Sequence, residues 1–97
     1  MTDPQPIIDS AAFGLELRLL RMRRGYARPE HLTAVMKRDF GIVVSERTIW
    51  AIERGDQLPR LDTFLAMLAV LGEGPEYFYP TFGDDAIARM TRSRDQR

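Results

Sequence analysis

The sequence predicts an all-α protein of five short helices, and three features of the chain lead to this prediction. Apolar residues recur at helical spacing in several segments, and no segment shows the strict alternation of a half-buried strand. Most of these segments have a capping residue before them and a glycine after them. A chain of 97 residues, 44% of them hydrophobic, suffices for one domain with a modest core.

The first two helices are expected to follow an N-terminal arm. Residues 1–9 have no helical period and are expected to be flexible. Ser10 is expected to cap a helix that runs to about Arg24, before Gly25. The second helix is predicted to begin at Pro29 and to end before Gly41. Its apolar stripe consists of Leu32, Val35, Met36 and Phe40.

The remaining helices follow a short β-branched run at residues 42–44, which we expect to be an extended connector with buried side chains. Ser45 is predicted to cap a third helix over residues 46–54. A fourth helix over residues 61–71 is apolar almost all round, so we expect it to be the most buried element. Residues 84–94 are predicted to form a short helix in a C-terminal tail that begins at residue 80.

The charges of the chain are segregated, although they sum to zero. Residues 13–60 hold ten Lys and Arg against six Asp and Glu, a balance of +4, whereas residues 1–12 and 61–97 each carry −2. A basic middle between acidic ends is compatible with a nucleic-acid partner.

Several classes of function are not expected. Cysteine is absent, which excludes disulfides and thiolate chemistry, and the single histidine, His31, has no acid, base or nucleophile grouped with it. We therefore expect no enzyme, no cofactor and no metal site. No membrane-length apolar run or signal peptide is present, so a soluble cytoplasmic protein is expected.

Three segments resemble one known family. Residues 13–25 resemble the first helix, residues 45–55 (SERTIWAIERG) the recognition helix, and residues 59–72 the fourth helix of the Cro and lambda-repressor class, often called XRE-type. The resemblance covers roughly residues 11–79 and implies a five-helix, lambda-repressor-like helix-turn-helix domain over residues 10–79. Two features depart from the family: residues 32–45 form a longer connection, and the usual glutamine near the start of helix 2 is missing.

The resemblance implies a sequence-specific DNA-binding transcriptional regulator, such as a repressor, that acts on double-stranded DNA as a homodimer. The alternative is an antitoxin-type protein whose tail, residues 80–97, binds a partner protein while the helix-turn-helix autoregulates. The position of residues 84–94 would separate the two, because a regulator is expected to fold them back on its own subunit.

The third helix supplies the expected base contacts. At 100° per residue, Ile49 and Ile52 point to one side and must face the core. Arginine can donate to guanine and glutamate can accept from cytosine in the major groove. The expected base-contacting residues are Glu46, Arg47, Trp50 and Ala51. Trp50 is expected to contact DNA, or else a neighbouring side chain or the connector.

Backbone phosphates are expected to be bound by residues around this helix: Arg28, Ser45, Thr48, Arg54 and Arg60. The resemblance further implies an ion pair between Glu53 and Arg21, which we interpret as structural.

A second apolar stripe on the first helix, Leu15, Leu19 and Met22, lies nearly opposite Phe13 and Leu17. Only one face can meet the core, so something else must cover the second. The expected cover is a dimer interface that includes Ile87 and Met90 of the last helix. The alternative is coverage by this chain's own ends.

Overall fold

The computed structural model describes residues 6–84 and 86–89, and these residues fold as an all-α protein. Four α-helices and one 3-10 helix follow in order: α1 Ser10–Arg23, α2 Pro29–Phe40, α3 Glu46–Glu53, α4 Leu61–Leu71 and η1 Pro75–Thr81. Asp84 and residues 86–89 are also helical, whereas the remainder of the predicted helix over residues 84–94 lies outside the described residues. Within the described ranges there is no strand, only an isolated antiparallel bridge between Ile8 and Phe82.

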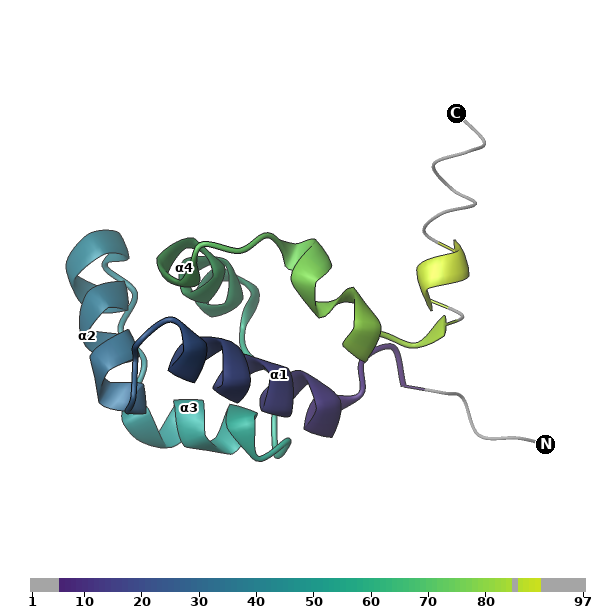
Figure 1. Ribbon diagram of the computed structural model, residues 1–97, viewed down its shortest axis with the longest axis horizontal. Helices are drawn as coiled ribbons and strands as arrows, with labels where there is room; N and C mark the ends of the chain where they lie inside the picture. The colour runs from purple at the N-terminus through teal and green to yellow at the C-terminus, as the bar shows by residue number, and fades with distance from the viewer. Residues whose placement is uncertain (1–5, 85, 90–97) are drawn as a thin grey trace.

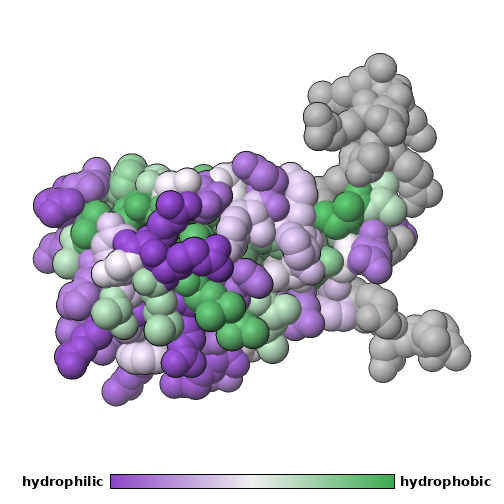
Figure 2. Space-filling model, viewed as in Figure 1, coloured by the Kyte–Doolittle hydropathy of each residue, from purple (hydrophilic) through white to green (hydrophobic). Residues whose placement is uncertain are grey.

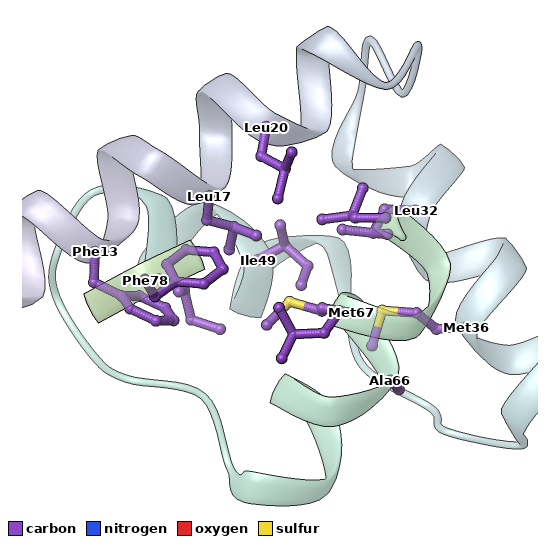
Figure 3. Packing of buried hydrophobic residues seen from close by; sticks show 12 residues of the cluster. Phe13, Leu17, Leu20, Leu32, Met36, Ile49, Ala66, Met67 and Phe78 are labelled. Carbon is purple, nitrogen blue, oxygen red and sulfur yellow. The ribbon is translucent and has the colours of Figure 1, made fainter. Parts of the chain in front are cut away.

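The helices surround one core, with α1 across the middle of the molecule (Figure 1). Helix α3 lies below α1, α4 lies above it, and α2 closes one end of the core. Leu17, Leu20 and Ile49 meet at the centre of this core (Figure 3). At the other end, the ring of Phe13 lies 4.6 Å from that of Phe78 and 5.6 Å from that of Phe64, centroid to centroid.

The predicted helix ends are largely confirmed. Pro29 is in the first turn of α2, and Ser45 caps α3 by accepting a hydrogen bond from the Thr48 amide at 3.1 Å. Gly41 and Gly72 end α2 and α4 in the left-handed conformation, at φ 66° and 74°. A positive φ costs glycine little because it has no Cβ.

The start of α1 was predicted wrongly. Asp9, not Ser10, is the N-cap, and its carboxylate accepts from the Ala12 amide at 3.1 Å. The Asp9 amide donates to the Thr81 carbonyl at 2.8 Å, which holds the chain extended up to this residue. Residues 6–9 are therefore tied to the end of the fold and are not a free arm.

Helix α4 has the largest share of buried residues, as expected, but several apolar side chains are more exposed than the sequence suggested. Leu61 is 73% and Leu65 50% exposed, because only one side of α4 faces the core. Phe40 is 49% exposed, since it lies in the last turn of α2, beyond the buried Met36. Val43 is 79% exposed, whereas its neighbours in the connector, Ile42 and Val44, pack against the core.

None of the helices among the described residues combines the length and the apolar character that a membrane crossing requires.

Candidate nucleic-acid interface

Helix α3 presents one face to the core and the opposite face outward. Ile49 and Ile52 are fully buried, in agreement with the predicted orientation of the helix. Glu46, Arg47, Trp50 and Arg54 are all exposed, and Ala51 is half-buried between them. The four residues expected to contact bases therefore lie on one surface of a single helix.

A buried ion pair holds the end of α3 against α1. Arg21 donates to the two carboxylate oxygens of Glu53 at 2.7 and 2.9 Å, and both side chains are only 2% exposed. Arg21 also donates to the Tyr26 carbonyl, so the guanidinium ties the loop after α1 to the same point. The pair expected from the sequence is thus present, and it is internal to the fold.

Two glycines allow α1 and α3 to approach closely. A methyl group on Gly14 would overlap the backbone carbonyls of Ile52 and Glu53. A methyl group on Gly55 would lie 2.8 Å from the Cα of Ala11. Gly14 was not among the residues predicted to matter, although a glycine inside a helical pattern is a signal of close backbone approach.

The cations expected at the interface differ in their intramolecular partners. Arg28 lies 3.5 Å from Glu30, Arg54 lies 3.0 Å from Asp56, and Arg60 lies 3.6 Å from Asp62. No described residue forms an ion pair with Arg47. Exposed pairs such as these contribute little to stability. Among these four expected cations, Arg47 is therefore the one that a ligand can engage without breaking a pair.

Trp50 contacts a neighbouring side chain, which was one of its expected environments. Its indole N–H donates to the Glu46 carboxylate at 3.3 Å, one helical turn away. The side chain remains 39% exposed. Glu46 and Trp50 therefore form a joined polar and aromatic surface beside Arg47.

The expected backbone contacts are partly brought together. Ser45, Thr48 and Arg60 line one shallow hollow between the connector and the loop that precedes α4. The hydroxyls of Ser45 and Thr48 lie 2.9 Å apart and are hydrogen-bonded to each other. Arg28 precedes α2, and its hydrogen bond is to Glu30 and not to any of these three residues.

The shifted pKa values lie away from this surface. On α2, the hydrogen bond from Arg38 to Asp39, 2.8 Å long, lowers the pKa of Asp39 and raises that of Arg38. Within residues 6–84 and 86–89, no group of His, Asp and Glu is arranged to hold a metal ion.

Of the residues expected to form an interface, the three on α1 are exposed. Leu15, Leu19 and Met22 are 53%, 43% and 51% exposed, so no described part of the chain covers them. Ile87 is half-buried, and Met90 lies outside the described residues.

Comparison of the chain with models of protein families, with curated proteins and with solved structures gave no match.

Proposed function

We propose that the protein is a sequence-specific DNA-binding transcriptional regulator that reads the major groove with α3. The observation that carries this proposal is the outward face of α3, where Arg47 is exposed and has no acidic partner among the described residues. An unpaired cation on the exposed face of a short helix can bind double-stranded DNA, which is anionic and has a major groove wide enough for a helix.

The arrangement of α2 and α3 supports a helix-turn-helix of the lambda-repressor class as the finer description of the fold. The order of the helices, the buried side of α3 and the pair between Arg21 and Glu53 agree with that class. The connection over residues 41–45 contains no helical residue. We propose that α2 lies against the DNA backbone and α3 enters the groove.

Each side chain on α3 has a chemical role in this proposal. The Arg47 guanidinium donates two hydrogen bonds to guanine N7 and O6. Glu46 accepts from a cytosine amino group with the lone pairs that Trp50 leaves free. The ring of Trp50 contacts a thymine methyl group or a deoxyribose.

The phosphates on either side are bound by the hollow that Ser45, Thr48 and Arg60 line. Arg54 and Arg28 bind further phosphates after exchanging their weak intramolecular partners for them. These contacts position the helix and carry little sequence information.

The test is selection of bound sequences from a pool of random duplexes, followed by titration of the selected duplex. The chain has one tryptophan, and it lies on α3. Its fluorescence should therefore change on binding the selected duplex, and less on binding a scrambled duplex at the same salt concentration. A pool that yields no enriched sequence would contradict the proposal.

A matched pair of variants locates the contact. Arg47→Ala on α3 should relax the selected sequence at one base position. Lys37→Ala on α2, which removes the same charge, should leave the selected sequence unchanged. The same change in both variants would mean that charge alone, and not the face of α3, determines binding.

A further inference from the structure

The outer face of α1 carries a stripe of three exposed apolar side chains, Leu15, Leu19 and Met22. In the space-filling view a hydrophobic patch lies over the middle of α1 on the face turned to the viewer (Figure 2). We infer that this face is the contact surface of a symmetric homodimer, in which α1 packs antiparallel against α1 of a second copy. This inference stands apart from the proposed function, because it requires no DNA.

The spacing of the stripe suits a second helix. Leu15, Leu19 and Met22 are separated by four and then three residues, the spacing of the apolar seam between paired helices. The core-facing residues of the same helix, Phe13, Leu17 and Leu20, are fully buried. Helix α1 therefore has two separate apolar faces, and only one of them is used within the described fold.

The remaining segments of this chain are poor candidates to cover the stripe. Residues 1–5 read MTDPQ and residues 90–97 read MTRSRDQR, so each contains a single methionine and otherwise polar residues or proline. Neither segment holds three apolar side chains to set against Leu15, Leu19 and Met22. A second copy of α1 supplies such a set.

The charged residues beside the stripe favour one orientation of the second copy. Glu16 and Arg23 are seven residues apart and flank the stripe on the same side, and Arg18 lies on the other side. In an antiparallel pair, Leu19 lies opposite Met22 of the second copy. Glu16 then lies opposite Arg23 of that copy, and by symmetry Arg23 lies opposite its Glu16. None of these three charged residues forms an ion pair with another described residue.

A parallel pair would be disfavoured by the same charges. It would bring Arg18 of each copy next to Arg23 of the other, which places like charges together twice. The flanking residues therefore favour one orientation of the same apolar stripe.

The symmetry of the antiparallel pair leaves α3 free. Its two-fold axis lies in the interface and is perpendicular to α1, so it runs up the page in Figure 1. Helix α3 lies below α1 in that view, and the axis keeps α3 of the second copy on the same side. The dimer would therefore expose both α3 helices on one surface.

The small size of this interface suggests a dimer of low affinity. One face of a 14-residue helix is smaller than the roughly 800 Å² per partner that stable protein interfaces bury. We therefore expect a weak dimer whose population rises with protein concentration over the micromolar range.

The test is sedimentation velocity of the full chain, without DNA, over a range of concentrations. Glu16→Arg and Arg23→Glu should each weaken self-association by at least tenfold, because each single change places like charges across the pair. An equimolar mixture of the two variants should associate again, since one copy then presents two cations and the other two anions. The double variant Glu16→Arg, Arg23→Glu should also recover the dimer.

Two controls separate the interface from the fold. Lys37→Glu makes the same charge change as Arg23→Glu on a different helix and should leave self-association unchanged. Thermal melts followed by circular dichroism should show that all variants remain folded. Recovery in the mixture cannot arise from misfolding of either variant.

The inference is overturned if the natural chain is monomeric at every concentration, or if the mixture associates no better than the single variants. A dimer that persists unchanged in Leu19→Glu would also overturn it, because the contact would then lie on another surface.

Discussion

Arg21 and Glu53 are a buried pair of charges joined by two hydrogen bonds, and their removal should have a large effect on stability. Glu53→Ala leaves the Arg21 guanidinium buried without its partner, so the expected loss is about 3–5 kcal/mol of unfolding free energy. Urea unfolding followed by circular dichroism measures this loss.

Glu73→Ala provides the matched control. It removes the acidic partner of Arg24 in a pair of similar length, 2.6 Å, whose arginine side chain is 46% exposed. Its expected cost is about 0–1 kcal/mol, as for other solvent-screened pairs. Equal losses in the two variants would show that burial of the first pair has no energetic consequence.

Arg47 and Arg60 should differ in what they contribute to DNA binding. Arg47→Ala should cost about 1–3 kcal/mol on the selected sequence and relax the preference at one base position. Arg60→Ala should weaken all duplexes to a similar degree, since Arg60 lines the hollow assigned to phosphate. The measurement is repeated selection with each variant, and identical profiles would contradict the division of roles.

At the residue scale, the sequence predicted which side chains of α3 face the core, but it left the partners of some other side chains open. The burial of Ile49 and Ile52 follows from helical spacing, which needs no knowledge of the other helices. Asp9 and Ser10 are both good caps, and only the contact with Thr81, far along the chain, decides between them. The partner of Trp50 was one of several alternatives for the same reason.

Helices α1 and α3 are held together by a close crossing at Gly14, and a single methyl group should disturb it. In a helix interior, glycine to alanine usually stabilises by about 0.5–1 kcal/mol. Gly14→Ala should instead destabilise the protein, because the new methyl group would overlap the carbonyls of Ile52 and Glu53. Thermal unfolding measures the sign of the change.

Ala34→Gly is a suitable comparison, since Ala34 is exposed in the middle of α2. It should cost about 1 kcal/mol through helix propensity alone. If Gly14→Ala raised the melting temperature, α1 and α3 would be shown to have room to separate.

At the element scale, helix boundaries could be predicted because caps and glycines are local signals. Gly41 and Gly72 end their helices as expected, at positive φ. Burial of whole faces could not be predicted in the same way. The composition of α4 is apolar on nearly every side, but the fold covers only the side that includes Met67 and leaves Leu61 and Leu65 exposed.

For the whole molecule, binding to DNA should weaken steeply as salt concentration rises. If Arg28, Arg54 and Arg60 each neutralise one phosphate, the slope of log K against log salt should be about −3 per protomer. A fluorescence titration of Trp50 at several salt concentrations measures it. A slope near zero would contradict DNA binding through these residues.

An intermediate slope also has a defined meaning. All three of these arginines have an acidic neighbour within 3.6 Å. A slope of about −1 would indicate that only one of them exchanges its acidic neighbour for a phosphate. Asp56→Ala should then steepen the slope by freeing Arg54.

The contact between Ile8 and Phe82 has a consequence for the order in which the chain folds. Ile8 and Phe82 are 74 positions apart (82 minus 8), and the bridge between them is accompanied by a hydrogen bond from the Gly83 amide to the Ile7 carbonyl at 2.7 Å. Synthesis proceeds from the N-terminus, so α1 emerges long before the residues that hold its first turn in place. The contact between residues 7–8 and 82–83 is therefore expected to form after the four α-helices have assembled.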